Sequence, residues 1–255
     1  MQFSYLSSAI NIKTISETAE KGVFEIEGLF AGYGLTIGNA LRRALLSSLP
    51  GAAITEVKVK NVSHEFSTLP GVKEDIVELA LNLKKLRLKM HVDEPQVLEL
   101  KAKGEKTITA RDIVPNSQVE IINPDEVIAT LTAKDAVLEM ELKAERGLGY
   151  SPVESRKSGR LSIGTIAVDA FFTPVKRVNY EIEDMRVGER TDYNRLRLEV
   201  ETDGTISPSS ALHKAANILK DHFDKVAAVQ VEEAAEAKSE QGEAPKKKGR
   251  PKKTE

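Results

Sequence analysis

The sequence of 255 residues contains no cysteine, no tryptophan and only four histidines. Without cysteine, the chain can form no disulfide framework, no thiolate metal site and no thiol nucleophile. The histidines are His64, His91, His213 and His222, and no two of them have the His-x-x-x-His spacing that puts two ligands on one helix face. These absences argue against a metalloenzyme, and we predict no metal site and no cofactor.

Long apolar runs are also missing. No stretch of about 18 apolar residues occurs, and the first residues lack a basic segment followed by an apolar one, so we predict neither a membrane span nor a secretory signal. The 37 basic residues nearly balance the 39 acidic ones, and hydrophobic residues make up 40% of the chain. This composition predicts a cytoplasmic protein of one or two domains with a sizeable core.

The carboxyl-terminal part of the chain differs in composition from the rest. From about Ala227 it is poor in large apolar residues and rich in Ala, Glu, Lys, Pro and Gly, so we expect residues 230–255 to be disordered. Residues 232–243 carry five Glu and one Lys, whereas residues 246–255 carry five Lys, one Arg and one Glu. An acidic block therefore precedes a basic one.

Alternating apolar and polar residues dominate the first 230 positions, as in half-buried antiparallel strands. The alternating segments are VFEIEGLF (23–30), AITEVKVKNV (53–62), RLKMHVDE (87–94), QVLELKAKG (96–104), AVLEMELKAE (136–145), NYEIEDMRV (179–187) and NRLRLEVET (194–202). Three segments instead have the helical period of 3.6 residues, namely Leu35 to Leu49, Glu74 to Leu88 and Pro208 to Val226. We therefore predict the α+β class, with mostly antiparallel strands and few helices.

The first predicted helix has two distinct faces. One face is an apolar stripe of Ile37, Ala40, Leu41, Ala44 and Leu45, and the other carries Arg42, Arg43 and Leu46. A leucine between two arginines indicates either a second contact surface or a solvated face with one exposed leucine. The helix alone does not decide between these two interpretations.

The last predicted helix opens with Ser207-Pro208, a capping hydroxyl followed by proline at the first helical position. Its apolar residues form a narrow seam of Leu212, Ala215, Ala216, Leu219, Phe223 and Val226. Such a seam packs against another helix or a symmetry mate, or against the sheet of its own domain.

A glycine motif, Gly32-x-Gly34-x-x-x-Gly38, follows a predicted strand and opens the first helix. A dinucleotide-binding loop occupies that position, which makes a nucleotide-binding α/β enzyme the alternative hypothesis. Its usual spacing is G-x-G-x-x-G, and further βαβ units would be needed to build a parallel sheet. The motif is therefore weak evidence, and no triad or carboxylate pair can be assembled from local sequence.

The chain resembles the alpha-subunit family of bacterial-type RNA polymerases. The resemblance lies in GLTIGNALRRALLSSLPGAAITEVKVKNVSHEFSTLPGVKEDIVELALNLKKL (34–86), GLGYSP (147–152) and IGTIAVDAFFTPVKRVNYEIEDMRVGERTDYNRLRLEVETDGTISPSSALHKAANIL (163–219). It covers nearly all of residues 1–226. It implies a discontinuous dimerisation subdomain, residues 1–50 plus 175–229, and an inserted β-rich subdomain, residues 51–174.

The resemblance also implies roles for the ambiguous helix faces. The expected contacts with a second alpha chain are Ile37, Leu41, Ala44, Leu45, Leu212, Ala216, Leu219 and Phe223. The expected contacts with the beta and beta-prime subunits are Arg42, Arg43 and Leu46, with Arg43 as the second arginine of the family's N-A-L-R-R motif. The stretch HEFSTLPGVKEDI (64–76) is similar to the family's loop and helix start on the same side of the enzyme.

By this resemblance the chain is a non-catalytic subunit of DNA-directed RNA polymerase, a nucleotidyltransferase. A homodimer would nucleate assembly of beta and beta-prime for DNA-templated RNA synthesis, and omega and sigma would join through the assembled enzyme. Magnesium chemistry would belong to the large subunits, so the resemblance implies no catalytic and no cofactor-binding residue here. It also implies a cytoplasmic, nucleoid-associated location.

The chain departs from the family after residue 226. Most alpha subunits continue into a helical domain that binds promoter DNA, whereas only 29 residues follow Val226 here, so we expect that domain to be absent. Residues 246–253, KKKGRPKK, are instead similar to an AT-hook core. We predict weak DNA contact by Lys246, Lys247, Lys248, Arg250, Lys252 and Lys253. The alternatives are a solubilising tail and a free-standing architectural DNA-binding protein.

Overall fold

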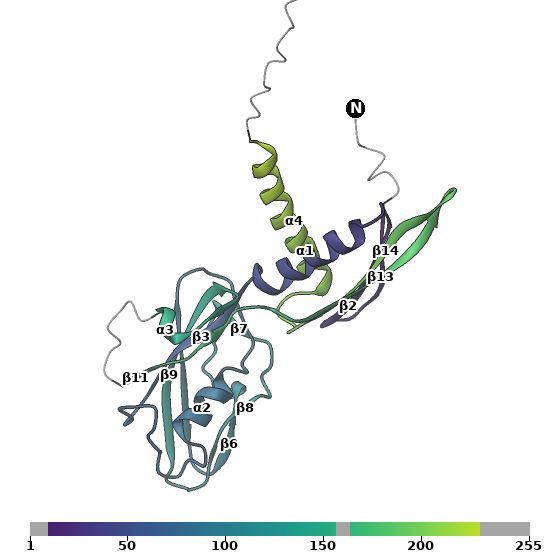
Figure 1. The fold of residues 1–255 in the computed structure, drawn as a ribbon. Helices are drawn as coiled ribbons and strands as arrows, with labels where there is room; N and C mark the ends of the chain where they lie inside the picture. Colours follow the sequence, from purple (N-terminus) through teal and green to yellow (C-terminus); the bar gives the residue numbers. More distant parts are fainter. Residues whose placement is uncertain (1–9, 157–163, 230–255) are drawn as a thin grey trace, which may run out of the picture.

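The computed structural model describes residues 10–156 and 164–229, and Figure 1 shows that they form two bodies joined end to end. The predicted tail, including the six basic residues proposed for DNA contact, lies outside the described residues. In the described part of the chain, no helix has the length and apolar character that crossing a bilayer requires.

The first body is a four-stranded antiparallel sheet with two helices on one face (Figure 1). Its strands follow the order β1 (Asn11–Glu17), β2 (Lys21–Leu29), β14 (Arg190–Thr202) and β13 (Val175–Val187). The helices are α1 (Tyr33–Ser47) and α4 (Pro208–Ala227). Successive side chains of a strand point to opposite faces of the sheet, which explains why the helices lie on one face only. In β2, Phe24 and Ile26 point into the core beneath the helices, while Glu25 and Glu27 point to the helix-free face.

The second body, built from residues 50–171, surrounds a larger sheet. Its order is β5 (Gln96–Lys103), β9 (Val137–Leu148), β3 (Pro50–Val59), β4 (Leu88–Met90) and β7 (Val119–Ile121), and β11 (Thr165–Ala167) also pairs with β3. Two short sheets pair β6 (Lys106–Thr109) with β8 (Val127–Leu131), and β10 (Tyr150–Ser151) with β12 (Ala170–Phe171). The helices are α2 (Ile76–Leu83), η2 (Ala110–Asp112) and α3 (Val153–Arg156).

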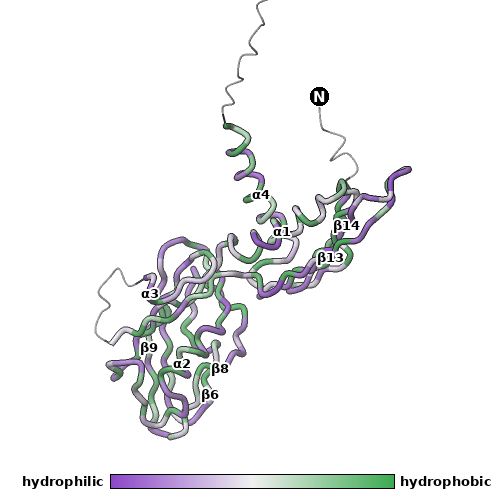
Figure 2. Tube along the Cα trace, in the orientation of Figure 1, coloured by the Kyte–Doolittle hydropathy of each residue, from purple (hydrophilic) through white to green (hydrophobic). Residues whose placement is uncertain are grey.

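Each body has its own hydrophobic core. One cluster of buried residues draws on residues 54–168, and the other draws on residues 24–49 and 175–215. A third, small cluster of Ala53, Ala170 and Phe172 lies where the two bodies meet. Figure 2 shows the alternation of apolar and polar residues along the strands that fills these cores from one face of each sheet.

The predicted α+β class with mostly antiparallel strands is confirmed. The predicted helix from Glu74 to Leu88 is too long, because Asp75 caps α2, the helix stops after Leu83, and Leu88 already belongs to strand β4. The first helix runs over Tyr33–Ser47 instead of Leu35 to Leu49, since Pro50 is the first residue of β3. The sequence analysis also missed several short strands, β1 and β6 to β8 among them.

Candidate functional site

The glycine motif at the start of α1 serves the packing of the helix. Gly32 has a left-handed backbone with φ of 83°, and its N–H donates to Asn194 Oδ1 at 2.9 Å. The N–H of Gly34 donates to the same oxygen at 3.4 Å. A Cβ on Gly38 would lie 3.0 Å from the ring of Tyr180, so this glycine lets the helix approach β13.

These contacts argue against the nucleotide-binding alternative. The amides that would cradle a phosphate already bind the side chain of Asn194 from β14. The strand before the motif also belongs to an antiparallel sheet, whereas a dinucleotide-binding fold needs a parallel one. The glycines therefore have a structural explanation.

The apolar stripe of α1 faces the chain's own sheet. Leu41, Ala44 and Leu45 are buried in the core of the first body, and Leu45 has no exposed surface. Ile37 packs against the same core and is partly buried. The prediction that these three buried residues form a dimer surface is corrected by their placement, because they fill the space between α1 and strands β13 and β14.

Helix α4 is packed over its first half only. Ala211 and Ala215 are buried against the core, and Leu212 and Leu219 lie partly buried at its edge. The later turns extend beyond the sheet (Figure 1), and there Phe223 is 64% exposed. The seam predicted as one surface is thus divided: Leu212, Ala215 and Leu219 pack against the core, whereas Phe223 and Val226 form an open half. Ala216 is exposed although it lies within the packed part.

Further apolar residues lie open on the helix side of the first body, where the sequence analysis did not predict them. Ile12 pairs in register with Ile26, whose side chain lies in the core, yet Ile12 is 63% exposed. Leu35, in the first turn of α1, is also exposed. We name Ile12, Leu35, Phe223 and Val226 the open apolar face.

The other side of α1 carries the predicted contact residues for the large subunits. Arg42 and Arg43 are exposed, and Leu46 is partly buried. Among the residues that the structure describes, neither guanidinium forms an ion pair, so both remain available to a partner. The carbonyl of Leu46 accepts a hydrogen bond from Thr173 Oγ1 at 3.1 Å, which ties the end of α1 to the segment before β13.

The last turn of α1 lies next to the segment of the second body that leads to an aromatic pair, Tyr150 and Phe171. A Cβ on Gly149 would lie 3.6 Å from the carbonyl oxygen of Ser47, so the last turn of α1 borders the β10 segment. The ring centroids of Tyr150 and Phe171 are 4.6 Å apart, and Lys84 Nζ lies 5.5 Å from the Phe171 centroid. Both rings are about half exposed. We name Arg42, Arg43, Leu46, Tyr150 and Phe171 the arginine–aromatic surface.

An ion pair orders the region beside the aromatic pair. Lys84 Nζ lies 3.1 Å from Asp169 Oδ2, and Asp169 Oδ1 accepts the N–H of Val153 at 3.1 Å. The backbone donor of Val153 and then the ammonium of Lys84 hold the pKa of Asp169 below its usual value. A groove of about 290 Å³ runs alongside, lined in part by Val77 and Leu81 on the outer face of α2. The sequence analysis did not single out these residues.

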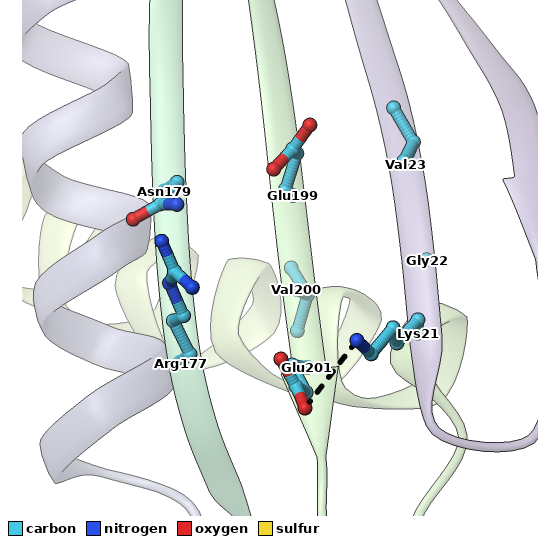
Figure 3. A pocket seen from close by; sticks show the side chains of 8 residues that line it. All are labelled: Lys21, Gly22, Val23, Arg177, Asn179, Glu199, Val200 and Glu201. Carbon is cyan, nitrogen blue, oxygen red and sulfur yellow. Dashed lines mark ion pairs between the residues drawn. The ribbon is translucent and has the colours of Figure 1, made fainter.

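The helix-free face of the first sheet has a shallow polar pocket of about 270 Å³ (Figure 3). Its charged lining mixes both signs, and Lys21 Nζ lies 3.7 Å from Glu201 Oε1. The remaining lining residues are Gly22, Val23, Arg177, Asn179, Glu199 and Val200. Within residues 10–156 and 164–229, no three His, Asp or Glu side chains converge as a metal site would require. We assign no chemistry to this pocket.

Comparison with known proteins gives one consistent family. A family model described as the RNA polymerase Rpb3/RpoA insert domain matches residues 57–173. A DNA-directed RNA polymerase alpha subunit of Alkaliphilus oremlandii is 49% identical over 215 residues, which is 84% of this chain and 68% of the relative. The same subunit of Symbiobacterium thermophilum is 52% identical over 215 residues, with the same coverage of 84% and 68%. That of Carboxydothermus hydrogenoformans is 54% identical over 202 residues, 79% of this chain and 64% of the relative. The matched region thus spans about two thirds of each relative.

Proposed function

The chain belongs to the family of DNA-directed RNA polymerase alpha subunits, and on this premise we propose that two copies form a dimer on which the large subunits beta and beta-prime assemble. Because the relatives are subunits of a nucleotidyltransferase, the proposal makes this chain a scaffold of that enzyme. The observation that carries it is the open half of α4, where Phe223 and Val226 are 64% and 67% exposed and belong to none of the hydrophobic clusters of the described residues.

Physical reasoning favours a second copy as the partner of the open apolar face. A helix with an exposed apolar stripe lowers its free energy by burying that stripe, and the last turns of α4 extend beyond the sheet of their own chain (Figure 1). In a two-fold dimer the same face is used twice, so one open face on each chain is enough. The interface that we propose comprises Ile12, Leu35, Ala216, Leu219, Phe223 and Val226, with Ile37 and Leu212 at its edge.

We assign the arginine–aromatic surface to the large subunits. A guanidinium presents five donors in a planar fork and suits the carbonyls and carboxylates of a protein partner. Aromatic and arginine side chains are also the residues that carry most of the binding energy at protein interfaces. Arg42 and Arg43 are exposed, and no residue of this surface belongs to the open apolar face, so one chain can hold its copy and a large subunit at the same time.

Two variants test this division of surfaces. Arg43→Ala should leave the dimer intact in light scattering and reduce the capture of purified beta by the tagged dimer. Phe223→Asp should instead yield monomers. Arg111→Ala is the matched control, since Arg111 is an exposed arginine of the second body whose partner is Asp125. If Arg43→Ala captured beta as the unmodified chain does, the assignment of the arginine–aromatic surface would be wrong.

In this proposal nucleotidyl transfer is carried out by the large subunits, and omega and sigma bind the assembled enzyme. The chain then needs no catalytic residue of its own. A cytoplasmic, nucleoid-associated location follows, because the assembled enzyme works on the chromosome.

The basic tail is a separate proposal that rests on sequence alone. The motif KKKGRPKK at residues 246–253 would place Arg250 in a narrow minor groove and its lysines on phosphates. The test compares the full chain with a chain ending at Val226 for binding to A·T-rich and G·C-rich duplexes at low salt. Tighter binding of the full chain to the A·T-rich duplex is expected. If the full and shortened chains bound the A·T-rich duplex with equal affinity, the DNA contact by the tail would be ruled out. If the tail raised the affinity for both duplexes equally, it would be a tail that binds polyanions without sequence preference.

A further inference from the structure

The two bodies meet at a small buried site centred on Phe172. Only two chain segments connect the bodies among the described residues, one between α1 and β3 and one between β12 and β13. Phe172 lies in the second segment, is buried, and clusters with Ala53 and Ala170 apart from either main core. This third cluster therefore anchors the second connecting segment to the second body, at the point where the chain passes to the first.

Two glycines make room for Phe172. Gly51 of β3 and Gly147 of β9 are cross-strand partners in the sheet register. A Cβ on Gly147 would lie 2.6 Å from the Phe172 ring, and a Cβ on Gly51 would lie 1.7 Å from the Phe172 carbonyl oxygen. Neither strand could carry a side chain here, so the aromatic ring fills the gap that a paired set of glycines leaves in the sheet.

Hydrogen bonds hold the same segment to both bodies. The N–H of Phe172 donates to the carbonyl of Gly149 at 2.8 Å on the side of the second body. Thr173 Oγ1 donates to the carbonyl of Leu46 at 3.1 Å on the side of the first body. The connection is thus fixed at consecutive residues, one to each body.

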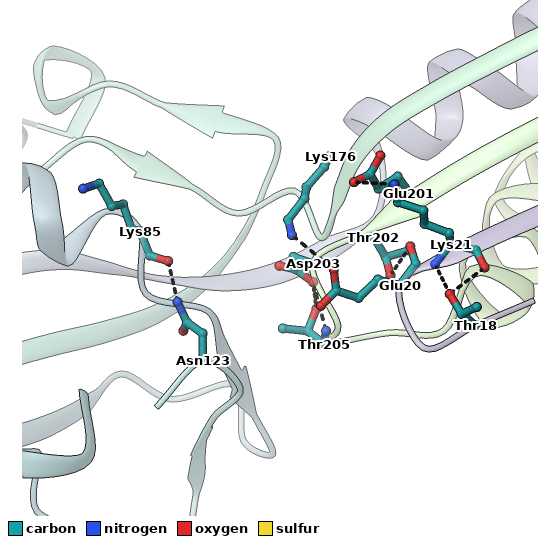
Figure 4. Close-up of polar contacts among 10 residues, drawn as sticks. All are labelled: Thr18, Glu20, Lys21, Lys85, Asn123, Lys176, Glu201, Thr202, Asp203 and Thr205. Atoms are coloured by element: carbon teal, nitrogen blue, oxygen red, sulfur yellow. Dashed lines mark hydrogen bonds and ion pairs between the residues drawn. The ribbon is translucent and has the colours of Figure 1, made fainter. Parts of the chain in front are cut away.

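A second contact between the bodies lies at the turn before α4. A Cβ on Gly204, whose φ is 90°, would lie 3.2 Å from Ile122 Cγ2 of the second body. Figure 4 shows the polar contacts that shape this turn, where Asp203 Oδ1 accepts the N–H of Thr205 at 3.0 Å. On the facing side Asn123 Nδ2 donates to the carbonyl of Lys85 at 3.0 Å. Two separate contacts restrict the angle between the bodies more than one would.

Two consecutive residues, the last of β12 and the first after it, link this joint to the exterior. Phe172 is buried with Ala53 and Ala170, whereas Phe171 is half exposed and contacts Tyr150 and Lys84. The arginine–aromatic surface itself crosses the joint, because Arg43 and Leu46 belong to the first body and Tyr150 and Phe171 to the second. Any rotation between the bodies would separate its two halves.

We propose that Phe172, packed over Gly51 and Gly147, locks the two bodies at one angle and so keeps the two halves of the arginine–aromatic surface in a single arrangement. The lock follows from the geometry alone, while its consequence for partner binding rests on the proposed function. Where two parts of a chain share only a small interface, motion of one part relative to the other is the usual expectation. Phe172 is therefore a positioning residue, and it need not touch the partner.

The lock can be tested without any partner. Because the chain has no cysteine, Lys134→Cys in the second body and Glu189→Cys in the first give a clean pair of spin-label sites. The labelled chain is diluted into excess unlabelled chain, so that a labelled chain in a dimer is paired with an unlabelled copy. The measured distances are then distances within one chain. We expect a narrow distance distribution that widens about twofold or more in Phe172→Ala, and Phe171→Ala, its exposed neighbour, should stay narrow.

Two results of the distance measurement would contradict the lock. A narrow distribution in Phe172→Ala, or a broad one in the parent chain, would overturn the lock. If Phe172→Ala does not fold, Phe172→Leu decides, since it keeps part of the apolar volume and should widen the distribution to an intermediate extent; an unchanged width would again overturn the lock.

Capture of beta tests the consequence. Phe172→Ala should weaken capture although Phe172 is buried, and Phe172→Leu should restore part of it. Normal capture by a variant with a widened distribution would overturn the link to partner binding and leave the lock in place. A parent chain that captures no beta at all would instead contradict the proposed function, and the distance measurement would still stand.

Discussion

Asn194 Oδ1 accepts the N–H of Gly32 at 2.9 Å, so a residue of strand β14 caps helix α1 at a residue 162 positions earlier in the chain. The same oxygen lies 3.4 Å from the nitrogen of Gly34, and Asn194 Nδ2 donates to Asp184 Oδ1 at 3.0 Å. One buried amide therefore satisfies the free amides at the start of α1 and fixes the helix to the hairpin of β13 and β14. The arrangement connects the two ends of the chain that build the first body.

Replacing Asn194 with alanine should destabilise the first body. The change removes the acceptor of two N–H groups, of which that of Gly34 is buried, and the loss costs about 1–3 kcal/mol. Urea unfolding followed by circular dichroism would measure the loss. Asn217→Ala is the control, because Asn217 is exposed on α4 and its side-chain amide lies within hydrogen-bond distance of the His213 ring, one turn earlier on the same helix. Equal stability of Asn194→Ala and the parent would show that the cap is unimportant.

The occupied helix start also predicts how the chain responds to nucleotides. ATP or NAD at millimolar concentration should leave the melting temperature unchanged, because binding to the folded state alone would raise it by mass action. Differential scanning fluorimetry checks this directly. A rise with increasing nucleotide that disappears in Gly34→Val would revive the glycine loop as a binding site.

The strand pattern could be predicted from sequence because a half-buried sheet imposes a period of two on its residues. Strand β1 escaped prediction, since its register shifts between Thr14 and Ser16 and its side chains are exposed, so no alternation had to be kept. The short strands β6 and β8 offer too few residues for a period to be seen.

Local sequence patterns do not predict contacts between distant segments. The apolar stripe that contains Leu45 has the same spacing whether it packs on its own sheet or on a second copy, and only the tertiary structure shows that it is buried within its own chain. Phe171 and Tyr150 come from separate strands, so their stacking leaves no periodic signal. The family motif points to Arg43 as a contact residue, which stays a prediction, whereas no motif points to the two aromatic residues that we place on the same surface.

The ion pair of Asp169 predicts a dependence of stability on pH. The pKa of Asp169 lies below its usual value of 3.8 in the folded chain, first because of the N–H of Val153 and then because of Lys84. A carboxyl whose pKa is lowered by folding adds stability above its unfolded pKa, and that contribution is lost as the pH falls through the lower folded value. Urea unfolding should therefore show a steeper loss of stability below about pH 4 in the parent than in Asp169→Asn. Identical pH profiles would mean that the pair contributes nothing.

The last prediction separates residues that hold one chain together from residues that we propose to hold two chains together. Leu45 is fully buried in the first body, so Leu45→Ala should lower the free energy of unfolding by about 2–5 kcal/mol. Phe223 is 64% exposed in the single chain, so Phe223→Asp should keep the parent's circular dichroism spectrum. In a dimer, however, the new carboxylate would be buried without a partner, and light scattering at micromolar concentration should report a monomer. A dimer as stable as the parent's would place the interface away from the open half of α4, whereas loss of folded signal in Phe223→Asp would mean that the helix end also supports its own chain.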